Sequence, residues 1–581
     1  MQGTGHVKEV LEEKEFLNPF SFVIVCISFG LMALHGQDRY SPFKQIHREN
    51  VGGITVAWTH ATGDQGTTIE CRPLVVDGVM YVTSPSLRVI ALDAANGRQR
   101  WSFVTEPPKP VGWTVNRGLA YWRKGSQERI LMGTPDGRLI SLHAQSGRPD
   151  KNFGDRGVVD LKAGVTNLSY GVTSAPAIFE DLVILGFAVG EGPGPAAPGD
   201  IRAFDVRNGR EVWRFHTVPR PGEFGHETWT GGAGDSWKDR GGVNAWGGLT
   251  VDEQNKLVFA GLGSPAFDFY GGDRKGANLF GNSVVALDAR TGKRVWHFQT
   301  VRHDIWDYDL PTPPVLVKSQ GKEAVAQVTK TGHVWILDRL TGVPLFGYEE
   351  RAVPPSDVPG EEAWPTQILP KKPPPIVPQV FEPSDASPET RALRCCSIFT
   401  PPSLQGTVTL PGFHGGANWS GAAWDPRTGL LYVNTNNVPN LTTLVPRKEG
   451  GYGIKGYVRF TDQDGNPASK PPWGMLTAVD LNRGEIAWQK TLGDGNGSEN
   501  FGGAIVTAGG LVFIASTKDE KFRAFAAATG DLLWEYQLPA GGYAAPVTYM
   551  VKGKQYVTIA AGGGGKLGTK RGDSFVTFAL P

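Results

Sequence analysis

A short repeat constrains the fold of this 581-residue chain more than any other feature of its sequence. Each full copy reads apolar residue, Asp, three residues, Gly, three residues, Trp. Full copies occur at Ala91–Trp101, Ala203–Trp213, Ala286–Trp296 and Ala478–Trp488. Weaker copies have Ala in the Asp position (Ala524–Trp534), Phe in the Trp position (Ile336–Phe346), or only the first half of the pattern (Ser141–Gly147).

The residue types indicate what each copy does. The apolar residues end a strand, and Asp and Gly form a tight turn in which Gly adopts a positive φ. The next strand carries the Trp, which packs between neighbouring sheets. One four-stranded sheet cannot bury both of its faces, so such units stack around a common centre. The interval from Asp338 to Asp480 is the longest and has room for one more blade. We therefore predict an all-β fold, an eight-bladed β-propeller.

Composition narrows the function. Lys plus Arg total 58 and Asp plus Glu total 57, so the chain lacks the basic excess that is typical of nucleic-acid-binding proteins. No glycine-rich nucleotide loop follows a predicted strand into a helix, which argues against nicotinamide and ATP chemistry. The sequence has no CxxCH motif, so no haem c is attached to it.

The first 36 residues differ from the rest. Phe16–Leu34 is uncharged and apolar, near the minimum length of a spanning helix and slightly long for the core of a signal peptide. We predict that residues 1–36 are a cleaved signal or a single membrane anchor, and that residues 37–581 form the propeller in the periplasm. A Pro-rich stretch at about 351–402 is predicted to be an inserted loop.

Four segments outside the repeats carry a resemblance to a known family. They are NRGLAYW at Asn116–Trp122, RHDIWDYDLP at Arg302–Pro311, NFGGAIVTAGGLVFIAST at Asn500–Thr517, and the closing segment Leu538–Pro581. In this order they resemble the PQQ-dependent alcohol and glucose dehydrogenases, and the closing segment is most similar to the membrane glucose dehydrogenase branch. The resemblance begins at about Asn50. It implies pyrroloquinoline quinone (PQQ), a Ca²⁺ (or Mg²⁺) ion and oxidation of a hydroxyl group.

The resemblance also implies which side chains hold PQQ, a planar ortho-quinone with three carboxylates. Arg117 matches the family arginine that pairs with a PQQ carboxylate, and Trp246 in NAWGG matches the tryptophan that stacks under the quinone plane. Lys330 in VTKTG matches the cation that polarises the reactive carbonyl. The further candidates are Glu70, Thr173 and Asn418.

The family's metal ion takes oxygen ligands, as hard cations do. Glu191, five residues after Gly186, has the spacing of the family's glutamate ligand, and Asp307 is expected beside it. The chain departs from the pattern at Ser264, which stands in a GLGSP turn where the alcohol dehydrogenases carry Asn. Either Ser264 binds the ion, or water takes its place, or Glu191, PQQ and Asp307 hold the ion together.

Asp307 in HDIWDYD is the predicted general base, because the reaction needs a carboxylate within hydrogen-bond reach of the substrate hydroxyl. Asp304 and Asp309 are alternatives for which a turn or salt-bridge role is more usual. His303 either lines the substrate entrance or has a structural role.

The cysteines allow two pairings after export. Cys71 pairs with Cys395 or Cys396, or the adjacent Cys395 and Cys396 pair with each other. The oxidising compartment favours disulfides in either case.

The sequence thus predicts an enzyme that oxidises an alcohol, a sugar such as an aldose, or a polyol, and passes two electrons to PQQ. Because the chain carries no haem, the electrons leave to a separate acceptor, membrane ubiquinone or a soluble cytochrome c. One alternative is a non-catalytic propeller scaffold of the outer-membrane assembly type. Another is a family member that has lost its metal.

Overall fold

The repeat forms a turn that binds the tryptophan of the preceding sheet. The computed structural model describes residues 39–105, 115–165, 168–230, 240–382, 393–419 and 421–581. In one copy, the Asp288 carboxylate accepts a backbone N–H two residues later at 3.0 Å, and Gly292 has a φ of +69°. A Cβ atom at Gly292 would lie 2.4 Å from the ring of Trp213, whose Nε1 donates to the carbonyl of Ala289 at 3.0 Å. The glycine is therefore required both by its φ and by the ring that covers it.

This docking recurs around the structure, including at the weaker copies of the repeat. The other pairs of ring and glycine are Trp58 with Gly97, Trp101 with Gly147, Trp296 with Gly342, Phe346 with Gly484, and Trp488 with Gly530. The repeat is thus a joint between neighbouring sheets, as its residue types predicted.

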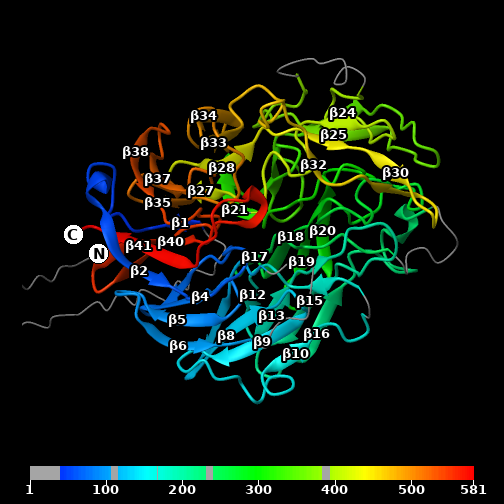
Figure 1. Ribbon diagram of the computed structural model, residues 1–581. Helices are drawn as coiled ribbons and strands as arrows, with labels where there is room; N and C mark the ends of the chain where they lie inside the picture. Colours follow the sequence, from blue (N-terminus) through cyan, green and yellow to red (C-terminus); the bar gives the residue numbers. More distant parts are fainter. Residues whose placement is uncertain (1–38, 106–114, 166–167, 231–239, 383–392, 420) are drawn as a thin grey trace, which may run out of the picture. The chain divides into compact units, whose positions relative to one another are not determined.

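The described residues form a series of mainly antiparallel sheets, six of which are four-stranded (Figure 1). The first two are β3–β6 (Leu74–Val76, Val79–Thr83, Val89–Asp93, Gln99–Phe103) and β7–β10 (Ala120–Lys124, Gln127–Gly133, Arg138–His143, Val158–Asp160). The next consists of β12, β13, β15 and β16 (Ala177–Phe179, Leu182–Leu185, Ile201–Asp205, Glu211–Phe215). It is followed by β17–β20 (Leu249–Asp252, Leu257–Gly261, Ser283–Asp288, Arg294–Gln299) and β21–β23 (Val315–Ser319, Lys322–Val328, Val334–Asp338).

The remaining sheets complete the circuit. One consists of β27, β28, β33 and β34 (Ala423–Asp425, Leu430–Asn436, Gly474–Asp480, Glu485–Thr491). Another consists of β35–β38 (Ile505–Thr507, Leu511–Ile514, Lys521–Ala526, Leu532–Gln537) with β1 (Tyr40–Ser41) parallel to β35. The last combines β2 (Thr55–Ala61) with β39–β41 (Val547–Val551, Lys554–Ala561, Ser574–Ala579).

The last sheet joins the two ends of the described chain. Thr55 of β2 is opposite Ala579 of β41, and the two strands are antiparallel. A buried apolar cluster that includes Trp58 and Phe575 packs this sheet against β4 and β5 of the first sheet. Similar clusters lie between each of the other consecutive sheets. The core is therefore a series of apolar layers between sheets, as in a β-propeller.

The expected extra blade between Asp338 and Asp480 is wrong. Within the described residues, this interval holds the hairpins β24–β25 (Tyr348–Ala352, Thr366–Pro370) and β30–β31 (Leu444–Pro446, Tyr452–Ile454). It also holds a small sheet of β26, β29 and β32 (Thr407–Thr409, Asn440–Thr442, Val458–Arg459) and the strands that belong to the Asp480 copy. The sheet without the repeat is the closing one, in which β2 pairs with β41 from the other end of the described chain.

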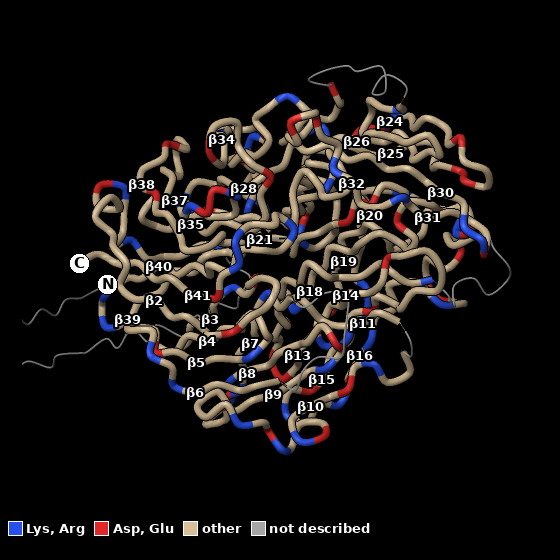
Figure 2. The backbone as a smooth tube through the Cα atoms, viewed as in Figure 1, with Lys and Arg blue, Asp and Glu red and all other residues tan. Residues whose placement is uncertain are grey.

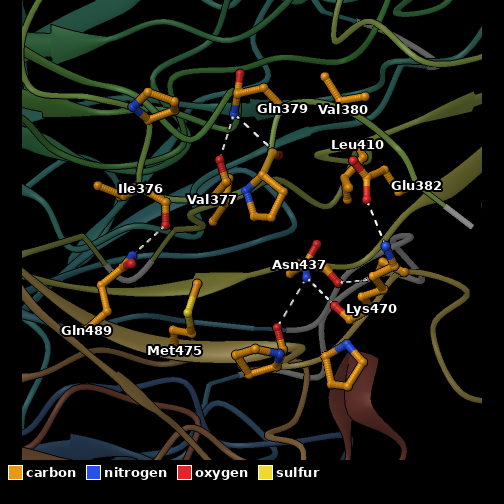
Figure 3. A pocket seen from close by; sticks show the side chains of 15 residues that line it. Ile376, Val377, Gln379, Val380, Glu382, Leu410, Asn437, Lys470, Met475 and Gln489 are labelled. Carbon is orange, nitrogen blue, oxygen red and sulfur yellow. Dashed lines mark hydrogen bonds and ion pairs between the residues drawn. The ribbon is translucent and has the colours of Figure 1, made fainter. Parts of the chain in front are cut away.

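The Pro-rich insertion borders a pocket of about 600 Å³ against β33 and β34 (Figure 3). The amide of Asn437 donates to the carbonyl of Lys470 at 2.8 Å, and Gln489 donates to the carbonyl of Ile376 at 3.1 Å. Lys470 also pairs with Glu382 at 2.9 Å. None of the predicted site residues lines this pocket, so the pocket is separate from the predicted site.

The cysteines pair within the insertion. Cys395 and Cys396 form a vicinal disulfide, and Cys71 is a buried free thiol. The expected bridge from Cys71 is wrong, because its side chain packs in the apolar layer between the closing sheet and β4 and β5.

The predicted signal or anchor lies outside the described residues. In the part of the chain that is described, no helix is long and apolar enough to cross a membrane. The labelled helical segments there are short 3-10 turns, η1 (Val51–Gly53), η2 (His226–Thr228) and η4 (Gly565–Leu567). Basic and acidic residues are interspersed over the sheets (Figure 2).

Candidate active site

Lys330, which follows β22, lies between two aspartates of the loop after β20. Its Nζ atom is 2.6 Å from Oδ1 of Asp307 and 2.9 Å from Oδ2 of Asp309, and all three residues are buried. Burial opposes the charge of Lys330, but the two carboxylates raise its pKa well above the ordinary value. The ammonium group is therefore charged and held at the centre of the site.

The two aspartates differ in their electrostatics. Burial raises the pKa of Asp307 well above its usual value, and the charges of Asp309 and Glu191 add to this effect while Lys330 opposes it. Burial acts on Asp309 too, but Lys330 and the backbone N–H of Ser264, 2.6 Å away, hold the pKa of Asp309 below its usual value. Asp307 is thus the carboxylate of the pair that more readily takes up a proton.

Asp304 shapes the loop that carries these aspartates. Its carboxylate accepts two backbone N–H groups at 2.9 and 2.8 Å, the amide of Asn282 at 2.9 Å, and the hydroxyl of Ser264. These donors fix a turn in which Asp307 has a φ of +59°, a strained conformation for a residue with a Cβ. Asp304 therefore has the turn role, and Asp307 is presented by the turn.

His303 has a structural role. Its Nε2 atom lies 2.8 Å from Oε1 of Glu361, and its Nδ1 lies 2.9 Å from the carbonyl of Gly276. Both His303 and Glu361 are buried, so neither side chain is placed to meet substrate.

Four predicted cofactor residues come together from segments that lead into the first strands of consecutive sheets. Arg117 Nε lies 3.0 Å from Oε2 of Glu70, and Arg117 Nη1 donates to the hydroxyl of Thr173 at 2.9 Å. The backbone N–H of Arg117 also donates to the carbonyl of Thr173 at 2.8 Å. The guanidinium lies 5.4 Å from the ring centre of Trp246.

Trp246 connects this group to the aspartate pair. Its Nε1 donates to Oδ2 of Asp309 at 3.1 Å. Asn418, the other cofactor candidate, is engaged with its own loop: its amide donates to the carbonyl of His414, and its Oδ1 accepts the N–H of Trp419 at 2.7 Å. Trp419 in turn lies 4.8 Å from the guanidinium of Arg117.

These side chains fit a planar tricarboxylate. Arg117 lies over the ring of Trp246, and Asp309 links the same tryptophan to Lys330. Two cations and an aromatic ring are the groups that PQQ needs. Thr173 adds a hydroxyl at the same place.

The predicted metal ligands are less fully assembled. Burial and the charge of Asp309 raise the pKa of Glu191 to about 7, while Lys330 and Lys566 oppose that rise. The hydroxyl of Ser264 is occupied by Asp304. Among the described residues, no three acidic, His or Cys side chains are placed to share one ion.

Two buried residues that the motifs did not reveal supply unpartnered oxygen atoms here. Both carboxylate oxygens of Asp268 and both amide atoms of Asn244 are buried without a hydrogen-bond partner. A Cβ atom at Gly263 would lie 2.9 Å from Oδ1 of Asp309 and 3.0 Å from Oδ1 of Asn244, so these two oxygens flank the same point. Burial, then Glu191 and the aspartates, raises the pKa of Asp268 well above its usual value. An oxygen-rich, uncompensated set of this kind fits the chemistry of a hard cation.

No local motif marks Asp268 or Asn244. Asn244 precedes Trp246 by two residues, and Asp268 follows Ser264 by four. Proximity to recognised site residues is the only signal that sequence offers for them.

Comparison with known proteins identifies the family. Residues 32–557 match the model described as PQQ: Glucose/ethanol/alcohol dehydrogenase, beta-propeller domain. The quinoprotein glucose dehydrogenase of Escherichia coli is 31% identical, over 94% of this chain and 77% of that protein. The quinohemoprotein alcohol dehydrogenase of Comamonas testosteroni is 28% identical, with a TM-score of 0.73, and the match covers 93% of this chain and 78% of that one. A europium-containing methanol dehydrogenase is 26% identical, with a TM-score of 0.72, and the match covers 94% of this chain and 96% of that one.

The fold is that of a β-propeller, and the site gathers the cations and the aromatic ring that a planar anionic cofactor requires. The chain belongs to the PQQ-dependent glucose/ethanol/alcohol dehydrogenase family, so the predicted resemblance is confirmed. It is a PQQ-dependent oxidoreductase that acts on CH–OH groups. Membership of this family supports the enzyme over the alternative of a non-catalytic scaffold.

Proposed function

We propose that Arg117, Thr173, Trp246 and Lys330 bind PQQ while Asp307 removes the proton of a substrate hydroxyl. The observation that carries the assignment is Lys330 between Asp307 and Asp309, with Asp309 bonded to Trp246. When bound, PQQ supplies an electrophilic carbonyl that accepts two electrons. Lys330 would supply the positive charge that polarises the quinone oxygens.

Asp307 suits the role of general base. Its raised pKa makes its carboxylate a stronger base than an exposed one. Lys330 holds one of its oxygens at 2.6 Å, which orients the other oxygen for the substrate. Glu70 supports the site indirectly, because its carboxylate positions Arg117.

The metal in this proposal is Ca²⁺ or Mg²⁺, bound by Glu191 and Asp307. Ser264 was the expected third ligand, and its hydroxyl would have to leave Asp304 to bind. The unpartnered amide oxygen of Asn244 offers the stronger donor that the GLGSP turn lacks. Asn244 therefore joins Glu191, Ser264 and Asp307 as a proposed ligand.

The same proposal includes eight blades, export to the periplasm and a separate electron acceptor. The closed circuit of sheets supports the blade count. The apolar N-terminal segment supports export by signal or anchor. The absence of a CxxCH motif supports transfer to ubiquinone or a soluble cytochrome c.

Reconstitution tests the function. The purified chain is titrated with PQQ in the presence of Ca²⁺, Mg²⁺ or, because one solved neighbour contains europium, a trivalent lanthanide. Dye reduction is then measured with glucose, glycerol and ethanol. We expect PQQ and metal to be required together. Tight PQQ binding without dye reduction on any hydroxyl substrate would contradict the proposed catalytic roles.

A further inference from the structure

The loop between β40 and β41 carries Lys566 in the short turn η4. A Cβ atom at Gly562 would lie 2.3 Å from the backbone nitrogen of Ile69, and one at Gly564 would lie 2.2 Å from the carbonyl oxygen of Thr67. Such close approach is open only to glycine. The run of glycines therefore lets the loop pack onto the segment that precedes Glu70, and Lys566 follows directly in η4.

The backbone around Lys566 is fixed from two sides. The N–H of Gly565 donates to the carbonyl of Thr67 at 3.3 Å, and the carbonyl of Lys566 accepts from Nη2 of Arg459 at 3.0 Å. Arg459 is itself anchored by Glu499 at 2.7 Å. The loop thus presents its lysine in a defined direction.

The ammonium of Lys566 has no carboxylate partner among the described residues. Its Nζ atom lies 5.9 Å from the ring centre of Phe501. Glu499 lies nearby, but it already pairs with Arg459 at 2.7 Å and with His414 at 3.3 Å. A cation is left uncompensated on this side of the site.

Lys566 lies close to the catalytic centre, because its neighbour Gly565 is hydrogen-bonded to Thr67, three residues before Glu70. The charges of Lys330, Asp307, Glu191 and Glu70 all act on Lys566, so Lys566 lies within electrostatic reach of all four groups. Lys330 and Thr173 are buried, whereas Lys566 is exposed to solvent. Lys566 is therefore accessible from solvent, as a group that binds substrate must be.

We propose that Lys566 binds a carboxylate of the substrate, so that the preferred substrates of this chain are hydroxy acids, including sugar acids. The inference rests on the proposed function of the same site. An ammonium without a partner gains most from an anionic ligand, because a charge-assisted hydrogen bond is stronger than a neutral one. Neutral sugars and alcohols leave the ammonium uncompensated.

The test compares substrates that differ only by a carboxylate. The PQQ- and metal-loaded enzyme is assayed with sorbitol against gluconate and with glucose against glucuronate. Lys566→Met removes the charge and retains an apolar stem, and Lys566→Arg keeps the charge. Lys570→Met, in the same loop, is the matched control. PQQ affinity of each variant is measured separately by tryptophan fluorescence.

We expect kcat/KM to favour the acids in the wild type and in Lys570→Met. The preference should fall about 10- to 100-fold in Lys566→Met, mainly through KM, and be largely kept in Lys566→Arg. PQQ affinity should be unchanged. A Lys566→Met enzyme with weakened PQQ binding and an unchanged acid preference would place Lys566 at the cofactor and overturn the inference.

Failure of the proposed function has a different signature. An enzyme that oxidises the neutral substrates but not the acids refutes only the role of Lys566. A loaded enzyme that oxidises none of the four compounds, nor ethanol or glycerol, refutes the proposed function itself.

Discussion

Oδ1 of Asp307 lies 2.6 Å from Nζ of Lys330, and both side chains are more than nine-tenths buried. The contact joins the loop after β20 to the end of β22, so the predicted base and the predicted electrophilic cation are fixed against each other. Neither charged group needs a flexible loop to bring it to the centre of the site.

Replacing the base tests its role directly. In Asp307→Asn the amide keeps the size of the side chain but accepts no proton, so kcat should fall about 10²- to 10⁴-fold. PQQ affinity, measured by fluorescence titration, should change little, because Arg117 and Trp246 remain. Full activity in the loaded variant would remove Asp307 from the mechanism.

Asp304 offers a contrasting substitution three residues away. The carboxylate of Asp304 accepts hydrogen bonds from several donors, including the amide of Asn282 at 2.9 Å. In Asp304→Asn, an NH₂ group would face these donors, so some of the hydrogen bonds would be lost. We expect a loss of about 2 to 4 kcal/mol in the free energy of unfolding, measured by urea denaturation of the apo-protein. Asp307→Asn should cost clearly less stability. Equal stability losses in the two variants would contradict the division between positioning and catalytic aspartates.

Sequence predicts these aspartates because HDIWDYD is one contiguous motif. Arg117, Trp246 and Lys330 are likewise found through local motifs, and the structure brings them together. Asp268 and Asn244 are missed because their role depends on tertiary burial without partners, which no short pattern records.

The fold shows the same division. The Asp–Gly–Trp pattern predicts the joints between sheets, since turn and ring are coded within eleven residues. The closing sheet is not predicted, because β2 and β41 are separated by nearly the whole chain. The extra blade was therefore expected in the wrong interval.

The state of the cysteines can be checked by peptide mapping. Under denaturing, non-reducing conditions, Cys71 should alkylate, whereas Cys395 and Cys396 should appear in one unalkylated peptide. In the native protein Cys71 should react slowly, because it is buried and burial raises its pKa to about 11. Alkylation of all three cysteines before reduction would contradict the vicinal disulfide.

The pair of Glu361 and His303 predicts a pH dependence of stability. Burial alone would raise the pKa of Glu361, but the hydrogen bond and charge of His303 lower it below the ordinary value. A lowered folded-state pKa stabilises the protein above the unfolded-state pKa, and that contribution is lost as pH falls through the folded-state value. Glu361→Gln should therefore be less stable than the wild type at about pH 7, with the difference shrinking toward about pH 3.

The matched control for this measurement is Glu449→Gln, at an exposed side chain. Its unfolding midpoint should follow the wild type at every pH. A Glu361→Gln difference that stays constant with pH would show that the contact contributes through shape alone.

The glycine of the repeat gives the sharpest test of the fold. Gly292 and Gly321 have similar φ values, +69° and +76°, but a Cβ at Gly292 would lie 2.4 Å from the ring of Trp213, whereas one at Gly321 would have no neighbour within 4 Å. Gly321→Ala should cost only the backbone strain, about 1 kcal/mol. Gly292→Ala should cost about 2 to 4 kcal/mol, because the Trp213 ring must also move. Equal unfolding free energies for the two variants would show that the turn, and not the docked tryptophan, explains why the repeat requires glycine.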